Sequence, residues 1–312
     1  MTVAVQKRWT RRQRRWKAVN PWNRSVGELL PENRGPLGPY AGLKPAWAVE
    51  YFRRRFLRSL VSRVNFGRVL LADVGAGFGW LALAYAVSGG RAAVAIDSNP
   101  QRLRVLVKLA RILVPDSKVW AVAASAEHLP FKDAVFGVVA TVETLEHVGE
   151  GLPKRQARLY QRQALRELRR TSSDWILLST PNRWFPWVRH DVSLPLAHWL
   201  PHWLKRAYAG LFRRTDQCAR IRLLSVPEVE RALGVSGPVT PFLNFDSPSE
   251  WAEMFPYRTP YLPAPGKWVD RRGSLHAKIM TLFYRLLGTR ARYFYPSICG
   301  LYAVGTRGRR ES

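Results

Sequence analysis

The segment Val69-Leu-Leu-Ala-Asp-Val-Gly-Ala-Gly-Phe-Gly79 decides the fold class, because it predicts a strand that ends in a glycine turn. Its apolar opening is typical of a buried parallel strand, and Asp73 falls near the carboxyl end. Gly75, Gly77 and Gly79 follow at alternate positions, and a stretch of helical composition comes next. Glycine lets the backbone close on a ligand, and ligands of open α/β sheets bind outside the carboxyl ends of the strands. The segment therefore predicts a ligand-binding turn.

A second apolar stretch, Ala93-Val-Ala-Ile96, ends in Asp97. An acidic side chain at the end of a second strand can accept two hydrogen bonds from the ribose hydroxyls of a nucleoside. Two cofactors fit this pattern, a dinucleotide and S-adenosylmethionine. The dinucleotide fingerprint needs a further glycine where the helix packs closely on the strand, and Trp80 stands at that place. The tryptophan counts against the dinucleotide.

Three further motifs follow in order along the chain, at 124–131, 136–148 and 175–182. With the glycine turn and Asp97, they make residues 68–182 resemble the class I S-adenosylmethionine-dependent methyltransferases. The likeness is greatest to the branch that includes the quinone-biosynthesis enzymes and many small-molecule methyltransferases. It implies a doubly wound, mostly parallel α/β sheet of seven strands, in which the last strand, expected at 295–306, runs antiparallel to the others.

The resemblance also implies which residues hold the cofactor. Asp73 is expected to bind the ammonium side of the amino-acid tail, and Asp97 to bind the ribose hydroxyls. The family carries an aspartate against the adenine where this chain has Ser125, so that contact falls to the Ser125 hydroxyl, the Ala126 backbone or Glu127. The full set expected at the cofactor is Asp73, Gly75, Gly77, Gly79, Asp97, Ser125, Ala126 and Glu143.

Methyl transfer requires the nucleophile and the methyl group to be held in line and, for a hydroxyl or amine, a base. The fourth strand is expected to end near Thr141, so that Glu143, Glu146 and His147 face the methyl group. His147 is the first candidate base, since an imidazole exchanges a proton near neutral pH, and His190 is the second. Some quinone methyltransferases hold a divalent metal with the same Glu-x-x-Glu-His pattern. A metal and a purely structural role therefore stay as alternatives, and we assign no metal ligand.

The composition predicts one elaborated domain, or one and a half, with a strongly positive surface. The chain has 312 residues, of which 47% are hydrophobic, and 50 basic against 22 acidic residues give a net charge of +28. Such a field attracts nucleic acid or an anionic membrane surface. Cys218 and Cys299 indicate neither a disulfide framework nor a zinc site. With no apolar signal segment at the N-terminus, these features favour the cytoplasm.

The stretch 69–90 is nearly uncharged and close to the ~20 residues that a transmembrane helix needs. Asp73 within it and its strand-turn-helix pattern favour a buried core element instead, because a carboxylate inside a membrane is costly.

Three regions follow along the chain. Residues 1–44 form a basic tail and most of a Pro/Gly-rich connector at 31–45, which we expect to be a loop or linker. Residues 45–182 form the cofactor-binding core, which opens with a helix over 46–64 that buries an apolar stripe and leaves its arginines in solvent. Residues 183–312 form a substrate-side lid, an insertion with a helix at 275–287, and the closing strands, including one at 239–245.

The function favoured by these patterns is methylation of a small or lipid-linked acceptor, with the protein peripheral at an anionic membrane. The Trp-rich segment 198–208 mixes aromatic, leucine and basic residues as an interfacial helix does. A lid packed over the active site is an equal alternative for the same segment. The first alternative is an RNA methyltransferase that uses the Arg-rich surface, although the motif of enzymes that methylate base amino groups is missing at 141–144. The second is a cofactor-binding scaffold without catalysis. No stable protein partner is predicted.

Overall fold

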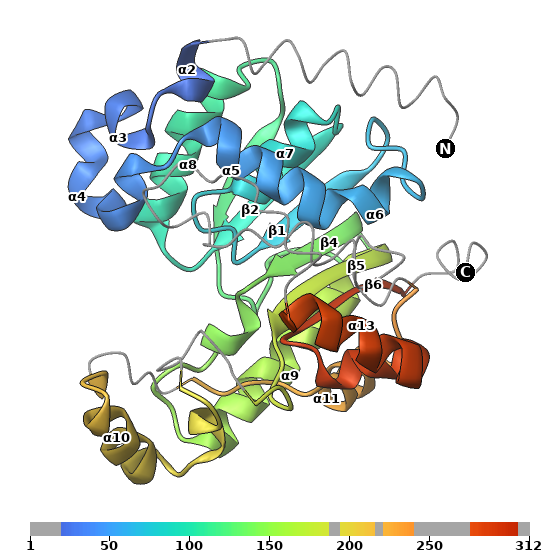
Figure 1. The fold of residues 1–312 in the computed structure, drawn as a ribbon. Helices are drawn as coiled ribbons and strands as arrows, with labels where there is room; N and C mark the ends of the chain where they lie inside the picture. Colours follow the sequence, from blue (N-terminus) through green and yellow to red (C-terminus); the bar gives the residue numbers. More distant parts are fainter. Residues whose placement is uncertain (1–19, 187–193, 216–220, 240–274, 305–312) are drawn as a thin grey trace.

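The computed structural model describes residues 20–186, 194–215, 221–239 and 275–304. In these ranges one sheet has the strand order β3-β2-β1-β4-β5-β6 (Figure 1). Neighbouring strands run parallel, except that β6 is antiparallel to β5. This order confirms the mostly parallel, doubly wound sheet and its antiparallel last strand. The strands are β1 (Leu70–Val74), β2 (Ala92–Asp97), β3 (Val119–Ala123), β4 (Phe136–Val142), β5 (Ser172–Pro181) and β6 (Ser297–Ala303).

Helices cover both faces of the sheet, so that the central strands are buried on both sides (Figure 1). Alternate residues of β1 enter different cores: Leu71 packs with helices α7 and α8, and Ala72 with α9 and α11. This burial explains why these strands are apolar at nearly every position instead of alternating. The helices are α7 (Trp80–Val87), α8 (Pro100–Leu113), α9 (Lys154–Thr171) and α11 (Val226–Leu233).

The stretch 69–90 folds as β1, the glycine turn and α7, which confirms that it is a buried core element. None of the helices in the described parts of the chain has the length and apolar character needed to cross a bilayer.

The expectation that residues 31–45 form a loop is wrong, because this connector and the residues just before it fold as a run of short helical turns. Leu30, Leu37 and Leu43 are buried in the same core as α7, and their burial fixes the backbone between them. The turns are α2 (Asn20–Asn23), α3 (Val26–Leu29), η1 (Pro31–Asn33), α4 (Arg34–Leu37) and η2 (Gly38–Gly42).

The helix expected over 46–64 is present, with its apolar stripe buried, but it is interrupted. It consists of α5 (Pro45–Phe52), a π-helical turn η3 (Arg53–Leu57) and α6 (Arg58–Val61). The expectation that its arginines are solvated is wrong for Arg53 and Arg55, which are only 4% and 7% exposed. The wider π turn changes the direction of the side chains, and Arg53 pairs with buried Glu50 at 2.7 Å between Nη2 and Oε1.

The region after β5 contains η5 (Ala197–Trp199), α10 (His202–Leu211), α11, α13 (Leu275–Leu287) and η7 (Gly288–Phe294). The helix expected at 275–287 is α13. Of the strand expected at 239–245, only Val239 is described, and its N–H donates to the Leu301 carbonyl of β6 at 2.7 Å. The basic tail, His190, Cys218 and most of the insertion lie outside the described residues.

Candidate cofactor and acceptor site

Two glycines of the turn after β1 are required by both conformation and space. Gly75 and Gly79 have φ values of +76° and +74°, which L side chains rarely adopt. A Cβ at Gly75 would lie 2.1 Å from the Thr144 Cγ2, and one at Gly79 would lie 1.8 Å from the Leu106 Cδ1. The turn can therefore lie against the β4 loop and α8 only with glycine at these positions.

Gly77 differs from its two neighbours, because it faces open space. Its φ is +55°, and no heavy atom lies within 4 Å of the place that a Cβ would take. Its N–H donates to the Asp97 Oδ2 at 2.7 Å. The turn thus presents bare backbone beside a carboxylate.

The Asp97 carboxylate is 7% exposed and is held by the backbone on both oxygens. Oδ2 accepts from Gly77 as above, and Oδ1 accepts from the Asn99 N–H at 2.8 Å. Each oxygen of an ionised carboxylate can accept two hydrogen bonds. Each oxygen can therefore accept one more hydrogen bond, which suits a pair of neighbouring hydroxyls such as those of a ribose.

A cavity of about 270 Å³ opens at the carboxyl ends of β1 to β4. It brings together six of the residues predicted from the sequence, from four separate segments of the chain: Gly75, Asp97, Ser125, Ala126, Glu143 and His147. The rest of its wall is Ser98, Arg102, Ala124, Glu127, Thr144, Val148 and Gly149.

Asp73 lies behind the turn and is not part of this wall. Its Oδ2 accepts from the Ala82 N–H of α7 at 3.2 Å. Burial raises the pKa of Asp73 to about 7, although the Ala82 hydrogen bond lowers it, and the nearby Asp97 adds to the rise. The contact that the structure gives to Asp73 is therefore with the helix, and its contact with a ligand ammonium stays a prediction.

Glu143 and Glu146 each receive a hydrogen bond from a hydroxyl of β5. The Ser179 Oγ donates to Glu143 Oε1 at 2.8 Å, and the Thr180 Oγ1 donates to Glu146 Oε2 at 3.0 Å. Glu146 has no exposed surface. Burial, followed by the charge of Glu143, raises its pKa well above the usual range. Glu146 therefore lies beneath the cavity, whereas Glu143 lines it.

His147, on η4 (Leu145–His147), points to a different partner. Its Nδ1 lies 2.9 Å from the Glu150 Oε2, and both side chains are about half exposed. Among the residues that the structure describes, no three His, Cys, Asp or Glu side chains are placed to hold a metal. Glu143, Glu146 and His147 do not form the ligand set of the metal alternative. Glu150 was missed from the sequence, although its spacing of three residues from His147 was a usable signal.

A buried arginine was also missed. The guanidinium carbon of Arg55 lies 6.0 Å from the centroid of the Tyr51 ring, and its charge acts on Tyr51, Cys299 and Glu143. Burial raises the pKa of the Cys299 thiol to about 11. The helix pattern gave no signal for Arg55, because a regular helical period places it in solvent, whereas in the structure it lies buried in the π turn.

Comparison with known proteins identifies the class. Residues 72–173 match the model of a family described as a methyltransferase domain. This range contains β2 with Asp97, the Ser125 segment and the His147 loop, in the order found from the sequence. Residues 72–173 therefore form a methyltransferase domain, and S-adenosylmethionine is its cofactor. The open backbone at Gly77 and the acceptor positions on Asp97 fit that molecule. No curated protein matches the sequence.

Several solved structures are similar to parts of the chain. The YcgJ protein of Bacillus subtilis is 20% identical, with a TM-score of 0.34 over 43% of this chain and 50% of that protein. Magnesium protoporphyrin IX methyltransferase of Synechocystis PCC 6803 with bound SAH is 16% identical, with a TM-score of 0.41 over 72% of this chain and 82% of that one. The matched part thus spans about half the length of the Bacillus protein.

Proposed function

We propose that this protein transfers the methyl group of S-adenosylmethionine to a small or lipid-linked acceptor at an anionic membrane surface. The observation that carries the proposal is one cavity whose wall includes both Asp97 and His147, with Glu150 paired to the His147 imidazole. When bound there, S-adenosylmethionine supplies a methyl group on a positively charged sulfur, which is already activated toward a nucleophile.

The residues of the chain divide the work between binding and proton transfer. Asp97 accepts hydrogen bonds from the ribose, and Ser125 and Ala126 lie against the adenine. His147 takes the proton of the acceptor, while Glu150 orients the imidazole and stabilises its positive form. Glu143, with its carboxylate fixed by Ser179 of β5, stands at the other side of the acceptor.

Helix α10 supports the membrane part of the proposal, because its apolar stripe faces outward. Trp203, Ala207 and Leu211 are spaced by four residues and share one face, and the first and last are 72% and 81% exposed. The opposite face, with Lys205 and Ala209, is buried. A surface helix of a globular protein usually has the reverse arrangement.

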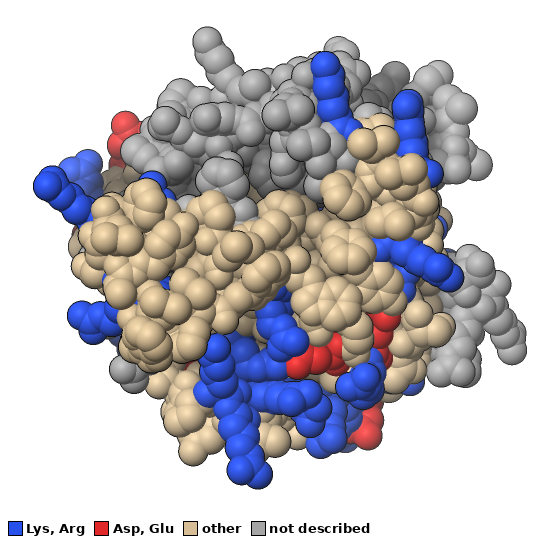
Figure 2. All heavy atoms as spheres, turned by 60° about the horizontal axis from the view of Figure 1, so that its bottom comes forward, with Lys and Arg blue, Asp and Glu red and all other residues tan. Residues whose placement is uncertain are grey.

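Further exposed apolar side chains lie next to α10, and basic ones surround them. Leu196, Trp199 and Phe212 are each close to half exposed, and Arg206 and Arg213 are exposed beside them. Figure 2 shows many Lys and Arg side chains gathered on the side of the molecule that carries α9 and α10. Apolar side chains that enter the headgroup region, with cations around them, suit a surface of anionic lipid.

Methyl transfer is tested by incubating the protein with isotope-labelled S-adenosylmethionine and separate lipid, metabolite and RNA extracts. Mass spectrometry then identifies the labelled product. We expect label in the lipid or metabolite extract. Label in RNA alone would replace the proposed acceptor class, and cofactor binding with no labelled product in any extract would indicate a scaffold without catalysis.

A further inference from the structure

A second cavity, of about 400 Å³, lies on the other side of the loop that carries His147. The wall of the cofactor cavity reaches Gly149, and the wall of the second cavity begins at Gly151. Cationic side chains from four segments line it: Lys154, Arg183, Lys205 and Arg222, with His198 and His202. No acidic side chain is among the described residues of this wall, and leucine, isoleucine and proline make up most of the rest.

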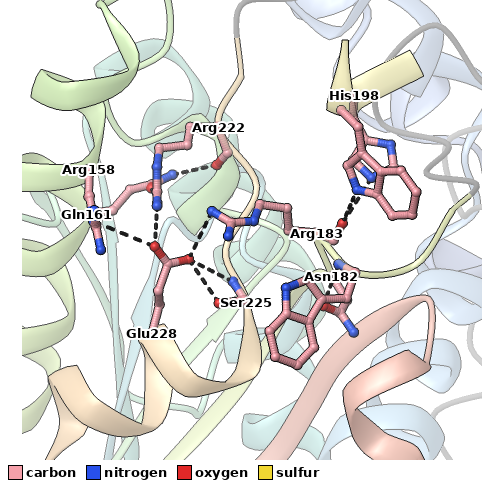
Figure 3. A network of polar contacts seen from close by, with 10 residues as sticks. Arg158, Gln161, Asn182, Arg183, His198, Arg222, Ser225 and Glu228 are labelled. Atoms are coloured by element: carbon pink, nitrogen blue, oxygen red, sulfur yellow. Dashed lines mark hydrogen bonds and ion pairs between the residues drawn. The ribbon is translucent and has the colours of Figure 1, made fainter. Parts of the chain in front are cut away.

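Glu228 lies behind this wall and is approached by three guanidinium groups (Figure 3). Arg222 forms a close ion pair with Oε1, Arg158 lies 3.6 Å from the same oxygen, and Arg183 lies 3.7 Å from Oε2. Oε2 also accepts from the Ser225 backbone N–H at 3.0 Å. One carboxylate is therefore shared among three arginines and a helix cap.

The arginine at the base of this cavity is held in place before any ligand binds. The Arg222 Nη1 donates to Gln161 Oε1 at 2.7 Å, and Gln161 Nε2 donates back to the Arg222 carbonyl at 2.7 Å. Gln161 is fully buried and also donates to the Leu145 carbonyl at 2.9 Å. Through Gln161, Arg222 is tied to η4, the turn that carries His147.

Two helices begin at this wall and add to its positive potential. α9 starts at Lys154 and α10 at His202, and neither has an acidic residue in its first turn. The free N–H groups and the dipole at a helix start favour an anion. Guanidinium and ammonium groups that converge from several sides match the oxygens of a phosphate.

We propose that this second cavity binds the phosphate group of an amphiphile, with the cations on the phosphate and the leucines against its apolar part. α10 contributes to this cavity with its inner face and carries the apolar stripe on its outer face, so a phosphate-bearing lipid can reach the cavity from a membrane. The idea that this amphiphile is also the methyl acceptor rests on the function proposed above. The binding of its phosphate is independent of that function.

The test compares two variants that remove the same charge from α9. Lys154→Gln removes a cation of the cavity wall, whereas Arg155→Gln removes an exposed cation of α9 that is not part of the wall. Each is measured against inorganic pyrophosphate by calorimetry, and against phosphatidylcholine vesicles with and without phosphatidic acid by sedimentation. We expect Lys154→Gln to weaken binding by about 10-fold or more, as loss of a charged hydrogen bond does. Arg155→Gln should change it less than about twofold.

Each outcome decides the inference. Variant-sensitive binding to the vesicles with phosphatidic acid supports the amphiphile. Variant-sensitive binding of pyrophosphate without binding to these vesicles would overturn it in favour of a soluble phosphate ester. Equal weakening by Lys154→Gln and Arg155→Gln, or no binding of either probe, overturns it. Binding of S-adenosylmethionine is measured with the same variants and should not change. If the wild-type protein did not bind S-adenosylmethionine, the proposed methyltransferase function would be contradicted, but the phosphate site would not.

Discussion

The Nδ1 of His147 lies 2.9 Å from the Glu150 Oε2 at the edge of the cofactor cavity. A hydrogen bond from Nδ1 to this carboxylate holds the proton on Nδ1, so that Nε2 is left to accept a proton. A carboxylate at this distance also stabilises the imidazolium that proton transfer creates.

We predict that His147→Ala lowers turnover by ~10²-fold or more and leaves the affinity for S-adenosylmethionine nearly unchanged. Glu150→Gln keeps a hydrogen bond but removes the charge, so it should lower turnover less. Steady-state kinetics and calorimetry measure the two effects. Full turnover in His147→Ala would move the base to another residue, with His190 the next to test.

The two glycines at the start of the turn make a matched pair for mutagenesis. Gly75→Ala places a methyl group against Thr144 and should destabilise the fold by ~1–3 kcal/mol or more. The new methyl group of Gly77→Ala meets no heavy atom within 4 Å. This variant should therefore lose only the ~1–2 kcal/mol of stability that a left-handed backbone costs a residue with a side chain, but it should hinder cofactor binding. Urea unfolding and calorimetry distinguish the two variants, and equal behaviour in both measurements would contradict the placement of the turn.

Asp73 should make stability depend on pH. Its pKa is raised by burial to about 7 in the folded protein, against ~3.9 for an unperturbed aspartate. Between these two pKa values the folded state keeps a proton that the unfolded state has lost. The free energy of unfolding therefore falls as pH rises, and the loss of stability is complete above the pKa of the folded state.

Asp73→Asn stays neutral at every pH and should remove this part of the slope. We expect the variant to gain roughly 1–4 kcal/mol over the wild-type protein between about pH 4 and pH 8. Urea unfolding without cofactor at the two pH values measures the change. Parallel pH profiles would show that Asp73 ionises normally.

Vesicle binding tests the outward stripe of α10. Trp203→Ala with Leu211→Ala should weaken sedimentation with anionic vesicles, because these side chains are expected to enter the headgroup region. Trp120→Ala is the control, since Trp120 is 49% exposed on strand β3, away from α10. Trp203 is a better choice than Trp199, whose Nε1 donates to the Arg183 carbonyl at 2.6 Å.

Removal of residues 1–20 should weaken vesicle binding further, by ~1 kcal/mol per base near the surface. RNA binding should respond to loss of these charges but not to loss of Trp203 and Leu211. Tight RNA binding, without vesicle association at low salt, would contradict the membrane proposal and favour the RNA alternative.

The sheet and the glycine turn were predictable from the sequence because their signals are local. The apolar run, the glycines and Asp97 stand within 30 residues of one another, and hydrogen bonding in a parallel sheet brings the strand ends to one edge.

The remaining features depend on contacts between distant segments. Arg55 lies in a π turn that interrupts its helix, and its charge acts on Glu143, whereas a regular helical period places it in solvent. The second cavity joins Lys154, Arg183 and Arg222 from three segments, and nothing in the spacing of those residues indicates that they meet.

Calorimetric titration of S-adenosylmethionine into the wild-type protein and into Asp97→Ala is the direct test of whether the cavity beside Asp97 binds the cofactor. We predict that the wild-type protein binds the cofactor and that the variant binds it ~1–3 kcal/mol more weakly, because charge-assisted hydrogen bonds to the ribose are lost. Asp116→Ala, which removes an exposed carboxylate elsewhere, should bind as the wild-type protein does. Equal affinity of the wild-type protein and Asp97→Ala would show that the cavity beside Asp97 is not the cofactor site.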